Sequence, residues 1–313
     1  MIHNSMTTMN MRRHMIGLLS CCWLLCFAQV AHAEAITKIT YGFGPGTGDT
    51  VIRSLAADAE QQGKHRFIVN NKPGAGGVVA IRDYFKEPAS EHNLLGITTG
   101  QAVIEAALNP ENDFTPRMKV IGPVITAPLV LAVGAHSEIR SMADLFDRSK
   151  PRRIINIGTG GLFHEGLVHM IARRSHHDIQ AVRFKGGADS FIALMGGHID
   201  ADVNTYGFFL PHLPKVKMLA ATQQQDLPHA PSMLEWVPEA RMMIFFAIAV
   251  NKEATPTQST ELLQKGFAHN KRQQFWESQG YVIDPNRDAN FVERVIIPEL
   301  QRWQKILPQT KKD

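Results

Sequence analysis

Cysteine is missing from most of this sequence, because Cys21, Cys22 and Cys26 all lie near the N-terminus. A mature chain that begins after that region has no disulfide, no thiol nucleophile and no thiolate metal ligand. Such a chain tolerates an oxidising compartment without needing one.

Runs of like charge are also missing. Two of the 33 Lys and Arg lie in the first 33 residues, which hold no Asp or Glu, so 31 positive charges face 29 negative ones and the remaining chain carries +2. These charges are interspersed, so we expect no nucleic-acid partner. No later apolar run reaches the roughly 20 residues that a membrane span needs.

The N-terminus has the pattern of an export signal. Arg12 and Arg13 precede an apolar run over residues 15–30, and Ala31-His32-Ala33 follows. This pattern predicts a signal peptide cleaved after Ala33 and a periplasmic protein. A membrane anchor is disfavoured because the run is short. A lipid anchor at Cys21 is the other alternative, disfavoured because almost no apolar run would precede the cysteine.

The mature chain alternates strand-like and helix-like segments, which favours α/β layers. Strands are predicted at residues 36–43, 66–70, 94–98, 120–124, 129–133, 154–157, 181–184, 199–203, 216–221 and 243–250. Helices are predicted at 51–59, 164–174 and 190–195, and two more close the chain, the last at 290–307 with a kink at Pro298. We therefore predict two similar lobes: residues 34–133 with 250–313 as lobe 1, and 134–249 as lobe 2.

Two glycine-rich turns, at residues 43–49 and 158–161, each follow a predicted strand and open a predicted helix. Glycine lets a ligand approach main-chain N–H groups closely. The first helical turn offers unpaired donors at a positive dipole end, which suits an anion. Asp49 or Thr50 is predicted to cap the first helix.

Three interpretations of these turns compete. Each could be an ordinary strand-to-helix connection, which we would favour for one turn alone. A nucleotide site is disfavoured because neither G-x-G-x-x-G nor G-x-x-x-x-G-K-[ST] occurs. Two helix N-termini that grip one carboxylate are the third interpretation. The presence of a pair favours it, since three or four charge-assisted hydrogen bonds at about 1.5–3 kcal/mol each suffice for micromolar binding.

A set of motifs distributed over nearly all of the mature chain carries a family resemblance. The motifs are Phe43-Gly44-Pro45-Gly46 with Asp49 and Arg53, Asn71-Lys72-Pro73-Gly74-Ala75-Gly76-Gly77, Gly158-Thr159-Gly160-Gly161, Phe184-Lys185-Gly186-Gly187 and Gly196-Gly197-His198-Ile199-Asp200. In this order the chain resembles the extracytoplasmic receptors of tripartite tricarboxylate transporters, often called Bug proteins. The seven-residue Asn-Lys-Pro-Gly-Ala-Gly-Gly motif is the most specific of these.

The resemblance implies a two-lobe, type II-like Venus-flytrap fold of the periplasmic binding proteins, with C-terminal helices that return to lobe 1. It implies a small organic acid as ligand, integral membrane permease subunits as partners, and neither catalysis nor a cofactor. It also implies that both glycine turns contact the ligand. The residues concerned are Phe43, Gly44, Gly46, Thr47, Gly48, Asp49, Thr159, Gly160 and Gly161, with His164 in the place of the family's helix-opening histidine.

Two further side chains are candidate ligand contacts. Lys185, with Arg183 beside it, could pair with a second carboxylate or remain solvated. Asp202, on a short strand, could reach the ligand or satisfy a loop. The aromatic side chains of Phe163, Tyr206, Phe208 and Phe209 are expected in the core or a lid, although two of them in the cleft would favour an aromatic acid.

Catalytic and metal sites are not expected. His164-Glu165 lacks the second histidine of H-E-x-x-H, and no G-x-S-x-G occurs. The sequence thus favours a monomeric transport receptor. A receptor that signals to a two-component sensor kinase is the alternative, and a periplasmic enzyme is the least favoured hypothesis.

Overall fold

One continuous mixed sheet organises the chain. The structure is a computed structural model that describes residues 35–121, 124–255, 258–268, 270–283 and 290–306, and contacts group Ile36–Asp313 into one compact unit. The predicted signal peptide, its cleavage after Ala33 and the lipid anchor at Cys21 lie outside the described residues. The strands are β1 (Ala35–Tyr41), β2 (His65–Asn71), β3 (Asn93–Thr98), β4 (Met118–Val120), β5 (Ile125–Gly134), β6 (Ile154–Thr159), β7 (Asp178–Arg183), β8 (Ala201–Thr205), β9 (Val216–Ala221), β10 (Met243–Asn251) and β11 (Val282–Ile283).

Helices follow most strands. They are α2 (Thr47–Glu60), α3 (Val78–Lys86), α4 (Ala106–Leu108), α5 (Met142–Phe146), α6 (Leu162–Ala172), α7 (Gly187–Met195), α8 (Tyr206–Phe209), α9 (Gln258–Phe267), α10 (Asn270–Ser278) and α11 (Ile297–Ile306). Two π-helical segments, η2 (Gly100–Glu105) and η7 (Val292–Ile296), precede α4 and α11.

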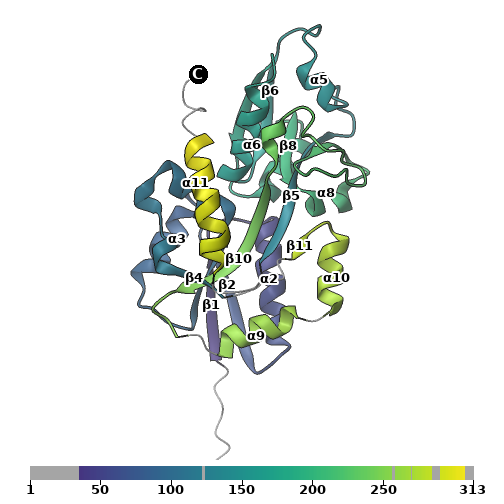
Figure 1. Cartoon of the computed structure of the whole chain (residues 1–313). Helices are drawn as coiled ribbons and strands as arrows, with labels where there is room; N and C mark the ends of the chain where they lie inside the picture. Colours follow the sequence, from purple (N-terminus) through teal and green to yellow (C-terminus); the bar gives the residue numbers. More distant parts are fainter. Residues whose placement is uncertain (1–34, 122–123, 256–257, 269, 284–289, 307–313) are drawn as a thin grey trace, which may run out of the picture. The chain divides into compact units, whose positions relative to one another are not determined.

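Strand β5 joins two groups of strands. The order along the sheet is β2-β1-β3-β10-β5-β8-β6-β7. The start of β5 pairs with β10 (Ile125 opposite Phe246), and its second half pairs with β8 (Leu129 opposite Thr205) and β9. We call β1–β4, β10 and β11 the first strand group and β6–β9 the second. Figure 1 shows β5 and β10 running between them.

Helix α2 illustrates how local sequence fixes the packing. The predicted apolar stripe of Val51, Ile52 and Leu55 is buried against the sheet, as are Ala56 and Ala59. The helix begins earlier than the stripe, at Thr47, and the prediction that Asp49 or Thr50 caps it is wrong because the N-cap is Gly46. Asp49 lies instead in the first helical turn. A flexible glycine can turn the chain directly from strand into helix, so the side-chain caps are not used.

The end of the chain is more elaborate than predicted. Three described helices, α9, α10 and α11, follow β10, with the short strand β11 between the last two, where two helices were expected. Helix α9 returns to the first strand group and packs on α2. Pro298 is the second residue of α11, one residue after the π-helical segment η7. Proline donates no hydrogen bond and crowds the carbonyl four residues back, so the wider π turn accommodates it.

The boundaries of the two lobes stay a prediction. The main buried cluster contains Ile39 and Ile248 from the first strand group together with Ile157 and Val203 from the second. A smaller cluster around Phe209 lies within the second group and its helices. The core therefore runs without a break across the proposed boundaries.

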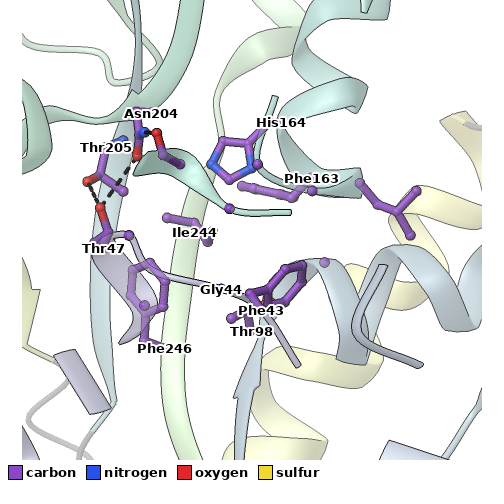
Figure 2. Close-up of a pocket in the computed structure, with 18 of the residues that line it drawn as sticks. Phe43, Gly44, Thr47, Thr98, Phe163, His164, Asn204, Thr205, Ile244 and Phe246 are labelled. Carbon is purple, nitrogen blue, oxygen red and sulfur yellow. Dashed lines mark hydrogen bonds between the residues drawn. The ribbon is translucent and has the colours of Figure 1, made fainter. Parts of the chain in front are cut away.

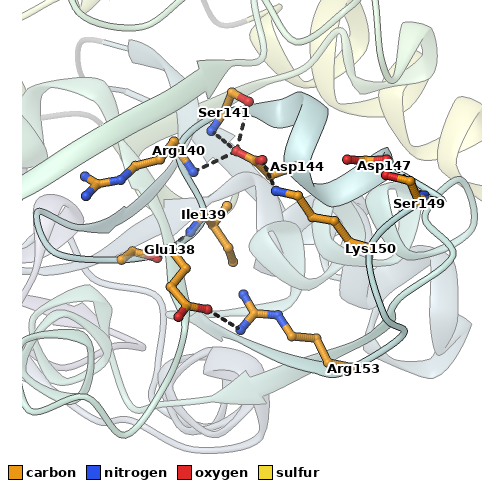
Figure 3. Close-up of polar contacts among 10 residues, drawn as sticks. Glu138, Ile139, Arg140, Ser141, Asp144, Asp147, Ser149, Lys150 and Arg153 are labelled. Carbon is orange, nitrogen blue, oxygen red and sulfur yellow. Dashed lines mark hydrogen bonds and ion pairs between the residues drawn. The ribbon is translucent and has the colours of Figure 1, made fainter.

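A cluster of polar contacts fixes the turn between β5 and β6 (Figure 3). The Asp144 carboxylate accepts hydrogen bonds from the backbone N–H groups of Arg140 (2.8 Å) and Ser141 (2.9 Å) at the start of α5, and it pairs with Lys150. The Lys150 ammonium is the main reason that the pKa of Asp144 falls to about 2. These charges are therefore satisfied within the turn and stabilise it.

Within the described ranges, no helix has the length and apolar character that crossing a bilayer requires.

Trp303 on α11 joins the last helix to the second strand group. Its side chain is 1% exposed and packs edge-on against Phe163 of α6, with ring centroids 5.9 Å apart. A Cβ added at Gly166 would lie 3.0 Å from the Trp303 ring, so glycine makes room for it. The C-terminal helix thus stabilises the helix that opens at the second glycine turn.

We expect Trp303→Ala to lower the free energy of unfolding by about 3–5 kcal/mol, because it leaves a large cavity between α11 and α6. Urea unfolding followed by circular dichroism measures this. Ile192→Ala is the matched control, since Ile192 is 67% exposed and its truncation should change stability by about 0.5 kcal/mol or less. Equal effects of the two substitutions would refute the proposed packing role.

Candidate functional site

A partly open cavity lies where strands of both groups end. Strands β1, β3, β6, β7 and β8 end at Tyr41, Thr98, Thr159, Arg183 and Thr205, and either their last residues or the turns that follow them reach the cavity. Ligands of α/β sheets bind outside the carboxyl ends of strands. The lining residues are Tyr41, Phe43, Gly44, Gly46, Thr47, Gly48, Thr98, Gly100, Gly160, Gly161, Leu162, Phe163, His164, Gly186, Gly187, Asn204, Thr205, Ile244 and Phe246, many of them visible in Figure 2.

The cavity is small. Its free volume of about 40 Å³ has room for about three water molecules, since each needs roughly 10–15 Å³. A carboxylate group, with three heavy atoms, is of this size. A larger molecule requires the walls to move apart.

Glycine-capped helix N-termini meet at the cavity. Helices α2, α6 and α7 have Gly46, Gly161 and Gly186 as N-caps, and in these described caps no side chain hydrogen-bonds the first turn. Their leading N–H groups have no acceptor within the helix and carry the positive end of the helix dipole. The sequence predicted the first two of these N-termini at the site and missed the third. The arrangement suits an anion.

The turn after β1 and the turn after β7 are in direct backbone contact. The Gly44 N–H donates to the Lys185 carbonyl (3.1 Å), and the Ala188 N–H donates to the Pro45 carbonyl (3.3 Å). These hydrogen bonds join the turn after β1 to the turn after β7, and therefore one strand group to the other.

Side chains would prevent this approach. A Cβ on Gly186 would lie 2.6 Å from the Pro45 carbonyl oxygen. Within the second strand group, a Cβ on Gly160 would lie 2.9 Å from the Gly187 nitrogen, between the turns after β6 and β7. Such distances are repulsive, and backbone atoms cannot rotate away as side chains can. Glycine at these positions is thus required by the contact between turns, in addition to leaving space for a ligand.

Gly48 has a different neighbour. A Cβ there would lie 1.8 Å from the Tyr41 hydroxyl oxygen, so the glycine makes room for a buried tyrosine. Burial raises the pKa of Tyr41, and the nearby Asp49 carboxylate adds to this effect. The Tyr41 hydroxyl is therefore neutral and belongs to the polar wall of the cavity.

A hydroxyl–amide network links the helix α2 N-terminus to β8. The Thr47 Oγ1 hydroxyl lies 2.8 Å from Thr205 Oγ1 and donates to Asn204 Oδ1 at 3.4 Å. The Asn204 Nδ2 amide donates to the Gly187 carbonyl at 3.2 Å. Figure 2 shows the Thr47 contacts as dashed lines beside the cavity. The network connects α2, β8 and α7, which the chain separates widely.

His164 contributes a neutral imidazole. Its ring lines the cavity at the start of α6, and its Nδ1 atom is buried with no hydrogen-bond partner in the described structure. Desolvation lowers the pKa of His164 to about 4, although Glu165 acts against this shift. At ordinary pH the ring is uncharged, and a buried nitrogen without a partner is costly unless a ligand supplies one.

Asp49 braces the first glycine turn without lining the cavity. Its carboxylate accepts hydrogen bonds from Arg53 Nε (2.9 Å) and Asn71 Nδ2 (2.8 Å). Asn71 Nδ2 also donates to the Phe43 carbonyl at 2.7 Å. Asp49 thus holds the turn in place, whereas Phe43, Gly44, Gly46, Thr47 and Gly48 themselves line the cavity.

Of the ligand contacts predicted at the second glycine turn and beyond, some line the cavity and others do not. Gly160, Gly161 and His164 line the cavity, whereas Thr159 is buried at the end of β6 and does not. Lys185 lines a neighbouring hollow rather than the cavity. No metal-like group of three His, Cys, Asp or Glu side chains occurs in the part of the chain that the structure describes.

Asp202 lies inside the second strand group, away from the cavity wall. It is 0% exposed, on β8 opposite Ala132 and Gly158. Burial raises its pKa to about 7, and the nearby Ser190 and Asn204 side chains offset only part of this effect. Its neighbour Asn204 belongs to the network at the cavity, so Asp202 sits one side chain behind the site.

Several cavity residues were not among the predicted ligand contacts. Gly186 and Gly187 follow a predicted strand and open a predicted helix, so the same pattern that revealed the first two turns could have revealed them. Thr98, Asn204, Thr205, Ile244 and Phe246 come from strands or their ends and have no recognisable motif. Of the predicted aromatic residues, Phe163 lines the cavity, Tyr206 and Phe209 are buried, and Phe208 is half-buried.

Comparison with known families agrees with this geometry. The family model described as tripartite tricarboxylate transporter family receptor matches residues 51–310. The chain belongs to this receptor family. Protein BugT of Bordetella pertussis is 23% identical over 287 residues, which cover 85% of this chain and 86% of that protein.

Solved structures share the fold. The periplasmic binding protein BugD superposes with a TM-score of 0.76 at 19% identity, covering 89% of this chain and 98% of that one. MatC from Rhodopseudomonas palustris, solved with bound malate, superposes with a TM-score of 0.77 at 16% identity, covering 88% and 99%. The receptor thus has the α/β Venus-flytrap fold of periplasmic binding proteins, as predicted.

Asp202 gives the receptor an unusual pH dependence of stability. Between about pH 4 and about pH 7 the folded chain holds a proton on Asp202 that the unfolded chain releases, so stability falls as pH rises. We expect Asp202→Asn to remove this slope and to stabilise the protein at about pH 8 by at least about 1.4 kcal/mol, the equivalent of one pKa unit.

Urea unfolding at a series of pH values from about pH 5 to about pH 8 tests this prediction. His164, with its lowered pKa, contributes the opposite slope in both proteins and therefore cancels from their difference. Parallel stability profiles for the two proteins would show that Asp202 does not titrate in this range.

Proposed function

We propose that this receptor binds a small organic acid through a carboxylate group and delivers it to the integral membrane permease subunits of a tripartite tricarboxylate transporter. It acts in the periplasm as a monomer, after cleavage behind Ala33. It performs no chemistry on the ligand and uses no cofactor.

The single observation that carries this proposal is the meeting of glycine-capped helix N-termini around one carboxylate-sized cavity. The donors at α2, α6 and α7 are oriented by the fold before any ligand arrives, so little free energy is lost in arranging them. His164 adds a buried nitrogen that lacks a partner. Family membership supports the same function, and malate bound to MatC is an acid of the proposed class.

The contacts between turns support a closing motion. The Gly44–Lys185 and Ala188–Pro45 hydrogen bonds join the two strand groups beside the cavity, so they break when the walls move apart to admit a larger ligand. A ligand favours closure only through contacts that it makes in the closed state. The carboxylate-binding N–H groups meet this condition, because α2 lies on the first strand group and α6 and α7 lie with the second.

A thermal-shift screen of the exported protein tests the ligand class. The panel contains aliphatic mono-, di- and tricarboxylates, acidic amino acids and aromatic acids, each with its amide. An acid at about 100 times its Kd should add roughly 2.7 kcal/mol and raise the Tm by several degrees. The amide should give no shift, because it lacks the charge. Equal shifts for acid and amide would contradict carboxylate recognition.

Gly186→Ala tests whether closure is needed for binding. The added Cβ meets the Pro45 carbonyl oxygen at 2.6 Å, so the turns after β1 and β7 are held apart. We expect the affinity for the best acid to fall at least about tenfold while the protein stays folded. Calorimetric titration measures the affinity. Gly134→Ala is the matched control, because nothing lies within 4 Å of its added Cβ. Wild-type affinity in Gly186→Ala would contradict the closing motion.

A further inference from the structure

A second hollow adjoins the cavity on the other side of Phe43. We call it the vestibule. Its free volume is about 380 Å³, against about 40 Å³ for the cavity. Its walls include Phe43, Gly160, Gly161, the turn at residues 73–77, Arg183 and Lys185.

The partition between the two spaces is thin. Phe43, Gly160 and Gly161 line both of them. A Cβ on Gly161 would lie 3.0 Å from Phe43 Cε1, so the partition consists of one half-buried ring against glycine backbone. Rotation of that ring joins the spaces. Since the cavity holds only about one carboxylate group, the rest of a longer ligand must extend into the adjoining space.

The charge available in the vestibule is that of Lys185. Arg183 is already paired, because its guanidinium donates to Glu165, with Nη2 2.5 Å from Oε2. The Lys185 ammonium makes no ion pair or hydrogen bond with any residue that the structure describes, and its side chain is exposed. An ammonium on a flexible four-carbon stem can move to meet an anion.

The position of Lys185 ties it to the cavity. Its carbonyl accepts the hydrogen bond from Gly44, which lines the cavity. Its Cβ is 3.9 Å from the place where a Cβ on Gly44 would lie. Lys185 therefore lies at the junction of the two turns and lines the vestibule beside it.

We propose that Lys185 binds the second carboxylate of a linear dicarboxylate whose first carboxylate occupies the cavity. This inference rests on the proposed function and adds the ligand class. The ring of Phe43 packs against the methylene spacer between the two carboxylates. A monocarboxylate fills the cavity alone and makes no use of Lys185.

Calorimetric titration of the exported protein tests the assignment. The probes are linear dicarboxylates from succinate to adipate and the monocarboxylates from butyrate to hexanoate with the same carbon numbers. We expect the wild type to prefer a dicarboxylate over its matched monocarboxylate by about tenfold, as a charge-assisted hydrogen bond provides. Lys185→Gln should abolish this preference and leave monocarboxylate binding unchanged. Added salt should reduce the preference in the wild type.

Two variants serve as controls. Lys185→Arg keeps the charge and should keep the dicarboxylate preference. Lys217→Gln makes the same change of charge at an exposed lysine on β9, outside both spaces, and should also keep it. Three outcomes would overturn the role of Lys185 and leave the proposed function standing. They are equal wild-type affinity for both acid classes, a dicarboxylate preference that survives in Lys185→Gln, and a preference that disappears in Lys217→Gln. Failure of every acid to bind would overturn both.

Discussion

The structure depends on a contact in which main chain touches main chain. The turns after β1 and β7 come close enough for Gly44 to donate a hydrogen bond to Lys185, and a side chain on Gly186 would collide with the Pro45 carbonyl. Because this contact joins the two strand groups, it determines the size of the cavity between them. Glycine-capped helix N-termini at the same turns then provide donors without side chains that would fill the space. One structural requirement thus produces both the joint and the binding site.

The cavity is suited to reversible capture. Its hydrogen-bond donors are backbone N–H groups, hydroxyls and the neutral imidazole of His164. The described residues that line it include no Lys or Arg that could hold an anion by charge. Dipoles of this kind act strongly only when water is excluded. Attraction for the ligand therefore rises as the turns come together and falls as they separate, so opening of the receptor favours release of the ligand.

Much of this arrangement could be predicted from sequence, because strands, glycine turns and the α2 stripe have local signals. The strand positions and two of the helix N-termini at the cavity followed from alternation and from glycine placement. The motif resemblance correctly identified the family and the fold. Asn204, Thr205 and Phe246 could not be predicted, since β8 and β10 bring them to the cavity by pairing with β5. The role of Asp49 as a brace depends on Asn71, far along the chain, and the π-helical segments leave no recognisable pattern.

Strand β5 has a consequence for attempts to divide the molecule. Its first residues complete the first strand group and its last residues complete the second, while the buried cluster continues through both. A fragment that carries either group alone would have an unpaired apolar strand edge open to solvent. Such edges recruit strands from other molecules. We therefore expect isolated halves to aggregate, because neither strand group is complete without β5.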